Sequence, residues 1–211
     1  MCLKILGVSG SPIPNSNTDR AVKAVLESSG LQSEFVKLSD INVRPCRACK
    51  RCVNDNICKQ EDDFQELAKK LRETEALVIG AYCPYANVDA FTKAFLERLW
   101  SMRHVKNLNE GKLVVIVVTG LTLSSSKRVS DRIAKEMQME NMDTVDTILI
   151  RGNLPCLTCG HGSECKMSGV PLIFGKGVKA SSDLCVRFED QKKVQEQISR
   201  IGELLNERLS T

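Results

Sequence analysis

The feature that most constrains the fold is the alternation of short apolar runs with longer amphipathic stretches. Three runs have the continuous hydrophobicity of strands buried on both faces: LKILGV (3–8), ALVIGA (76–81) and KLVVIVVTG (112–120). Two weaker strand patterns, SEFVKL (33–38) and VDTILI (145–150), complete a set of five. This order of elements predicts a parallel sheet, because parallel neighbours need a crossover between them.

Helical spacing fills the intervals between the strands. Asn17 or Thr18 is expected to cap a helix that runs through Ser29, and Asp62 or Asp63 to open one through Leu71. Three further helices are predicted within residues 89–103, 130–141 and 187–209. We therefore expect a single α/β domain over residues 1–211. Its architecture is a flavodoxin-like doubly wound five-stranded parallel sheet, order 2-1-3-4-5.

Two long loops interrupt this regular pattern, and both are rich in cysteine. The first, residues 40–60, follows strand two, and the second, residues 152–183, follows strand five. Long loops in a compact domain are usually functional. We therefore expect a cluster-binding loop at 40–60 and a second cysteine-rich loop at 152–183.

The turn after the first strand reads SGSPIPNSNT, from Ser9 to Thr18. In a doubly wound fold it lies at the carboxyl edge of the sheet, where ligands bind. Its hydroxyls, its free N–H groups and the helix start suit a phosphate. The turn lacks the patterns of a nucleotide-triphosphate loop and of a dinucleotide fingerprint. The alternative is a plain Ser/Asn-rich turn with a helix cap.

The most specific motif is PCRACKRCVNDNIC, with cysteines spaced C-x2-C-x2-C-x5-C at Cys46, Cys49, Cys52 and Cys58. Such a compact set favours ligands of a 4Fe–4S cluster. Zinc remains an alternative, although zinc sites more often use two separated pairs, and so does thiol redox chemistry. Arg47, Lys50 and Arg51 between the cysteines are expected to offset the cluster charge or to dock an acidic electron donor.

These motifs, together with YANVDAFTKAFLERL (85–99), resemble those of the iron–sulfur flavoproteins of anaerobic archaea and bacteria, within the flavodoxin-like NADPH-dependent FMN reductases. The resemblance spans roughly residues 3–102. It implies FMN, one 4Fe–4S cluster, a homodimer or homotetramer, and electron transfer with ferredoxin-like partners. By this resemblance the FMN phosphate is expected at Ser9, Ser11, Ser16, Asn17 and Thr18, and the flavin ring against Tyr85, Ala86 and Asn87. Further candidate cofactor-binding residues are Pro12, Ile13, Cys83, Pro84 and Gly120.

A second group of cysteines, Cys156, Cys159 and Cys165, has the spacing C-x2-C-x5-C. It can hold a second iron–sulfur cluster or metal, consist of plain thiols, or form a redox pair. The fourth ligand of a second site is either Cys185, which is near in sequence, or Cys83, which is expected at the same sheet edge. Cys2 is expected to be a thiol at a strand edge.

The net charge of +4 and the 4% of aromatic residues argue against a nucleic-acid partner, and no apolar run is long enough for a membrane span. The N-terminus lacks the pattern of a signal peptide, so we expect a cytoplasmic protein. The expected function is that of an electron-transfer FMN-dependent oxidoreductase reducing a small acceptor or a redox partner. Two alternatives are an iron–sulfur carrier without functional FMN and a zinc-stabilised scaffold.

Overall fold

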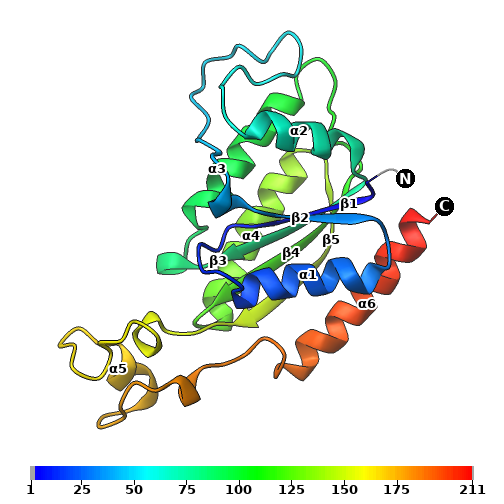
Figure 1. The fold of residues 1–211 in the computed structure, drawn as a ribbon. Coiled ribbons are helices and arrows are strands. Elements are labelled where there is room, and N and C mark those ends of the chain that lie inside the picture. The colour runs from blue at the N-terminus through cyan, green and yellow to red at the C-terminus, as the bar shows by residue number, and fades with distance from the viewer. Residues whose placement is uncertain (1–2, 211) are drawn as a thin grey trace.

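A computed structural model describes residues 3–210, and they form one parallel sheet with helices on both faces (Figure 1). Cys2 lies outside the described residues. The strand order is β2-β1-β3-β4-β5, so the predicted topology is confirmed. The strands are β1 (Ile5–Ser9), β2 (Ser33–Lys37), β3 (Ala76–Tyr82), β4 (Leu113–Gly120) and β5 (Asp143–Arg151).

The helices fall where the periodicity predicts them, with three differences. The cap of α1 is Ser16, one residue before the predicted caps, and α4 begins at Leu123 because the Thr122 hydroxyl caps it. The short α5 was not anticipated. The helices are α1 (Asn17–Ser29), α2 (Phe64–Glu73), α3 (Ala90–Leu99), α4 (Leu123–Met139), α5 (Val170–Phe174) and α6 (Lys192–Leu209). Single 3-10 turns are η1 (Leu38–Asp40), η2 (Pro84–Ala86), η3 (Trp100–Met102), η4 (Pro155–Leu157) and η5 (Ser182–Leu184).

Two hydrophobic cores lie on opposite faces of the sheet. Helices α2, α3 and α4 cover one face and α1 and α6 the other, as Figure 1 shows. The strands β1, β3 and β4 are almost wholly buried because both of their faces are covered. The helices α1 and α6 pack so closely that a Cβ on Gly202 would lie 2.2 Å from the Ser28 hydroxyl. A larger residue there would force the two helices apart.

The two cysteine-bearing segments leave the sheet on opposite sides. The segment after η1 lies over the side of α2 and α3, whereas the segment after β5 lies beyond α1 (Figure 1). Across residues 3–210, no helix has the length and apolar character to cross a membrane.

Candidate functional site

The carboxyl ends of the central strands bring three loops to one edge of the sheet. In the strand register, Ser9 lies beside Lys37 of β2 and Gly80 of β3, and Tyr82 lies beside Thr119 of β4. The turn before α1, the loop after β3 and the loop after β4 therefore begin at neighbouring positions. This is the edge at which doubly wound proteins bind their ligands.

The turn before α1 is held by a capping box. The Ser16 hydroxyl accepts the Asp19 N–H, and the Asp19 carboxylate accepts the Ser16 N–H. The same carboxylate accepts the Ser9 hydroxyl at 2.6 Å and the Lys37 ammonium at 2.7 Å. Lys37 also donates to the carbonyls of Ser11 and Ile13 at 2.6 and 2.9 Å. The turn thus contains one buried negative charge, and Lys37 balances it.

The first turn of α1 supplies N–H donors at the same place. Because the Asp19 N–H is used by the cap, the N–H groups of Asn17 and Thr18 are the first-turn donors left without a helical acceptor. The Thr18 side chain donates to the Thr119 hydroxyl at 2.9 Å and so links α1 to the end of β4. These donors suit an anion at the helix start.

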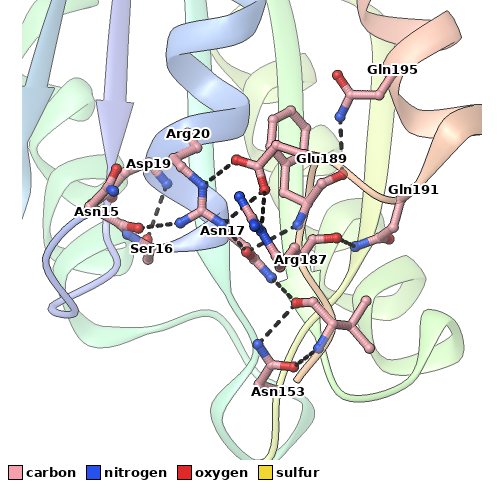
Figure 2. A network of polar contacts seen from close by, with 12 residues as sticks. Asn15, Ser16, Asn17, Asp19, Arg20, Asn153, Arg187, Glu189, Gln191 and Gln195 are labelled. Atoms are coloured by element: carbon pink, nitrogen blue, oxygen red, sulfur yellow. Dashed lines mark hydrogen bonds and ion pairs between the residues drawn. The ribbon is translucent and has the colours of Figure 1, made fainter. Parts of the chain in front are cut away.

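The Asn17 side chain does not face an open site in this structure. Its amide nitrogen donates to the Val186 carbonyl at 2.9 Å, and its oxygen accepts the Phe188 N–H at 3.2 Å. Nearby, Arg20 pairs with Glu189 at 2.6 Å (Figure 2). The segment that returns from the second cysteine loop is therefore attached to the start of α1.

The loop after β3 has an unusual backbone. Tyr85 and Ala86 both have left-handed φ angles, of 51° and 57°, although neither is glycine. Such conformations cost roughly 1 kcal/mol or more each and occur mainly at functional sites. The Tyr85 side chain is 99% exposed, and the Asn87 amide oxygen accepts Arg132 of α4. The loop thus presents an aromatic ring to solvent at the carboxyl edge.

Asp89 connects this loop to the turn before α1. As the cap of α3 it accepts the N–H and the hydroxyl of Thr92, both at 2.8 Å. A Cβ on Gly10 would lie 2.4 Å from the Asp89 carboxylate, so the turn needs glycine there. Burial raises the pKa of Asp89 to about 6, although its hydrogen bonds oppose the shift.

Cys83 directly follows β3 and is half-buried. Its sulfur lies 3.9 Å from the Ser126 hydroxyl at the start of α4, and a Cβ on Gly120 would lie 3.0 Å from it. Burial raises the pKa of this thiol, and the Asp89 charge adds to the effect. Cys83 is therefore a neutral thiol packed between β4 and α4.

The first cysteine loop is closed by hydrogen bonds between its two ends. The Asn42 N–H donates to the Asp63 carboxylate at 2.7 Å, and the Arg44 N–H to Asp62 at 3.0 Å. The Gln60 amide donates to the Pro45 carbonyl at 3.0 Å. These successive contacts bring the segment that precedes Cys46 against the segment that follows Cys58.

The far side of this loop rests on the segment after α3. Asn56 is buried with a φ of 57°, and its side-chain oxygen accepts the N–H groups of His104 and Val105 at 2.7 and 3.0 Å. Ala48 and Lys50 also have left-handed φ angles, of 49° and 60°. Left-handed residues at such short intervals turn the backbone sharply, and such a backbone can direct several cysteines toward one point.

The four thiols of the loop line one pocket. Cys46, Cys49, Cys52 and Cys58 surround it together with Arg98 and Trp100. Burial raises the pKa of the Cys52 thiol, and the charges of the other three cysteines raise it further. Hydrogen bonds with Arg51 lower the pKa of the exposed Cys49 thiol. The Ala48 N–H donates to the Cys46 sulfur at 3.4 Å.

A buried arginine forms the base of this pocket. The Arg98 side chain is fully buried, donates to both oxygens of Asp62 at 2.6 and 2.9 Å, and lies 4.5 Å from the Phe64 ring. Its Nε has no oxygen or nitrogen partner. Burial alone would lower the Arg98 pKa, but Asp62 and the neighbouring Cys58 outweigh it and raise the pKa. A permanent positive charge therefore lies against a candidate cluster ligand.

The donor set of the pocket consists of sulfur atoms. Among residues 3–210, no three His, Cys, Asp or Glu side chains converge on a position for a single metal ion. Four thiols around one pocket fit a 4Fe–4S cluster in the number and kind of ligand, and the neighbouring arginine provides a positive charge that would offset ligated thiolates. At the carboxyl edge, free N–H groups fit a phosphate, whereas the Asp19 carboxylate opposes one unless Lys37 balances it.

The second cysteine group lies on the other side of the sheet. Cys159 and Cys165 are exposed, and Cys156 and Cys185 are half-buried. None of the nine described cysteines forms a disulfide. The structure thus separates the two groups predicted from the sequence instead of merging them into one site.

Several residues of the site escaped the sequence analysis. Arg98 and Asp62 are charged and were not expected in a core, and the roles of Asn56, Lys37 and Asp19 depend on contacts between distant segments. One signal was available for Arg98: it lies three residues after Phe95 and four after Ala94, on the apolar face of its helix. A charged side chain on the apolar face of a helix indicates that a buried group of opposite charge lies against it.

The fold and the loops at its carboxyl edge define a flavodoxin-like protein. The sequence matches the NADPH-dependent FMN reductase family over residues 3–161, and the chain belongs to that family. Two solved structures share the fold at low identity. RosB, bound to an 8-demethyl-8-formylriboflavin-5′-phosphate intermediate, has a TM-score of 0.62 and 15% identity over 97% of this chain and 81% of its own. A flavodoxin from the Archaea has a TM-score of 0.54 and 15% identity over 99% and 100%.

Curated relatives refine the family. An iron–sulfur flavoprotein of Methanocaldococcus jannaschii is 32% identical over 104 residues, which are 48% of this chain and 54% of the relative. One of Archaeoglobus fulgidus is 31% identical over 124 residues, 56% of each chain. The chain spans about half the length of the curated relatives it matches. The resemblance to iron–sulfur flavoproteins is confirmed by these matches.

Proposed function

We propose that the chain is an electron-transfer iron–sulfur flavoprotein. It passes electrons between a 4Fe–4S cluster and FMN and so reduces a small acceptor or a redox partner. The observation that carries the proposal is the pocket lined by Cys46, Cys49, Cys52 and Cys58 in a chain of the FMN reductase family. A cluster supplies single electrons and FMN can hold one or two, so the pair converts one-electron delivery into two-electron reduction.

The residues of this chain have distinct parts in the proposal. The four thiolates bind the cluster, and Arg98 offsets their negative charge from beneath. The N–H groups at the start of α1 bind the flavin phosphate while Lys37 neutralises Asp19. Tyr85, exposed on a strained loop at the same edge, provides an aromatic surface for the flavin ring.

The same proposal includes the partners. Arg47, Lys50 and Arg51 are exposed around the most exposed thiol of the pocket, Cys49, and so suit an acidic, ferredoxin-like donor or acceptor. The chain is expected to form a homodimer or homotetramer. Sedimentation of the purified protein tests the assembly, and a purely monomeric profile at working concentration contradicts it.

A second candidate function is an iron–sulfur carrier without functional FMN. It is favoured by the Asp19 carboxylate in the phosphate turn and by the engagement of Asn17 with Val186 and Phe188. Anaerobic purification followed by iron, sulfide, zinc and flavin analysis separates the candidates. Iron, sulfide and FMN together support the flavoprotein, iron and sulfide without flavin the carrier, and a colourless zinc protein contradicts both.

A further inference from the structure

The segment between β5 and α6 is closed into a compact loop by two pairs of contacts. The Asn153 side chain accepts the Val186 N–H at 2.6 Å and donates to the Val186 carbonyl at 3.0 Å. Further in, the Ser163 hydroxyl accepts the Ala180 N–H at 3.0 Å and lies 3.4 Å from its carbonyl. Two stretches that are far apart in sequence are thereby held side by side.

One of these contacts brings the chain beside Cys185 to the chain beside Cys156. Cys185 directly precedes Val186, and Cys156 follows Asn153 by three residues, so the Asn153 contact places the two backbone segments at the same end of the loop. Cys83, in contrast, is packed against Ser126 and Gly120 at the end of β3. The structure therefore favours Cys185 over Cys83 as a partner of the group.

The backbone around these cysteines wraps tightly and directs N–H groups to sulfur. The His161 N–H donates to the Cys159 sulfur, and the Gly169 N–H to the Cys156 sulfur, each at 3.4 Å. A Cβ on Gly162 would lie 1.9 Å from the Cys156 carbonyl, so only glycine allows this wrap. N–H bonds to sulfur stabilise thiolate ligands and tune the clusters they hold.

The second loop shares its cysteine spacing and two local backbone features with the first, although the features follow different cysteines of the pattern. The spacing C-x2-C-x5-C occurs at Cys49, Cys52 and Cys58, and again at Cys156, Cys159 and Cys165. Each loop places a left-handed residue directly after one of its cysteines, Lys50 in the first and Gly160 in the second. Each also donates an N–H to a cysteine sulfur two residues earlier.

We propose that Cys156, Cys159, Cys165 and Cys185 hold a second iron–sulfur cluster. This proposal rests on the proposed function in one respect: it assumes that the cysteine spacing shared by the two loops is the spacing of cluster ligands. The site lies beyond α1, on the opposite side of the sheet from the first cluster loop (Figure 1). Because Asn17 binds the Val186 and Phe188 backbone, the second site is attached to the helix whose start is proposed to bind phosphate (Figure 2).

The test is the iron and acid-labile sulfide content of anaerobically reconstituted full-length variants. Wild-type protein should hold about eight iron atoms, and Cys159→Ala/Cys165→Ala should hold about half as many. Cys185→Ala should lose the same half, whereas the matched control Thr158→Ala, an exposed neighbour, should lose none. Unchanged iron in the double variant, or zinc in its place, overturns the proposal. A loss in Cys83→Ala but not in Cys185→Ala overturns the ligand set.

A second measurement does not depend on folding of the variants. Cys159 and Cys165 are exposed, so as free thiols they should react quickly with iodoacetamide, whereas cluster ligands are protected. Mass spectrometry of the loaded wild-type protein should show both unmodified until chelation removes iron. Rapid labelling of the loaded protein overturns the proposal. Failure of the first site instead shows as unchanged iron in the variant lacking Cys46, Cys49, Cys52 and Cys58.

Discussion

Arg98 shows how a single residue sets the conditions at the candidate cluster. Its charge is buried beneath the cysteines and is compensated by Asp62. A buried ion pair adds little net stability, but the loss of one partner leaves an unpaired buried charge. The pair therefore fixes the loop at a defined position while keeping a positive charge beside Cys58.

Arg98→Met should destabilise the protein by about 3–5 kcal/mol, because the buried Asp62 carboxylate loses its two-pronged partner and keeps only the exposed Arg44 guanidinium, at 3.7 Å. Adding Asp62→Leu should recover part of that loss. Lys93→Met on the same helix, which breaks a partly exposed pair with Glu136, should cost less than about 1 kcal/mol. Anaerobic urea unfolding measures all three. Equal costs for the two single variants would show that removing Arg98 does not leave the Asp62 charge poorly compensated.

Lys37 is the residue that decides whether the turn before α1 tolerates a phosphate. Lys37→Met leaves the Asp19 charge unbalanced, so FMN affinity should fall about tenfold. Riboflavin, which lacks the phosphate, should bind the variant and the wild type alike. Lys23→Met on α1, where the ammonium lies over the Phe35 ring of β2, serves as the control. An equal loss for FMN and riboflavin would mean that Lys37 acts on the ring site instead.

At the scale of elements, α3 begins with an acid whose pKa is shifted. Asp89 has a folded-state pKa of about 6 against an ordinary value of 3.8. The folded state therefore binds this proton more tightly than the unfolded state does. The stability gained from the proton is fully present below pH 3.8 and is lost as the pH rises through about 6.

Between pH 5 and 7 the free energy of unfolding of the wild type should fall by about 1 kcal/mol relative to Asp89→Asn. Asparagine keeps an oxygen to cap the helix but does not titrate. Asp131→Asn, at an exposed position on α4, should follow the wild type. If the free energy of unfolding changes with pH in the same way for the wild type and for Asp89→Asn, the pKa of Asp89 is not raised.

The elements also show what sequence patterns can predict. The strands β1, β3 and β4 were predicted because burial on both faces leaves a continuous apolar run. The start of α4 was missed because the run TLSSS reads as a loop, whereas the Thr122 hydroxyl caps a helix there. The first cysteine group was found from spacing alone. The contact of Asn17 with Val186 joins residues 169 positions apart, and no local pattern reveals it.

At the scale of the whole molecule, the proposed encounter with a redox partner depends on the distribution of charge. The basic residues of the first cysteine loop surround the exposed Cys49, whereas α6 covers the opposite face of the sheet. Electrostatic steering speeds association and weakens as salt is added.

Lys50→Glu/Arg51→Glu should therefore slow electron transfer from an acidic ferredoxin about tenfold at low ionic strength, and the difference from wild type should shrink at high salt. Lys192→Glu/Lys193→Glu at the start of α6 makes the same change in net charge on another surface and should have a smaller effect. Stopped-flow reduction of the loaded protein measures the rates. Equal changes in rate for the two double variants would indicate that the net charge of the protein, not the charge of the cysteine loop, governs the encounter.

The proposed electron transfer depends most directly on a cluster at the first cysteine loop. The decisive measurement is iron and acid-labile sulfide per chain in anaerobically purified Cys49→Ala/Cys52→Ala, with the exposed neighbour Asn54→Ala as control. The double variant should lose about four iron and four sulfide atoms while the control keeps them. A double variant that retains the full iron and sulfide of the wild type would contradict the proposal.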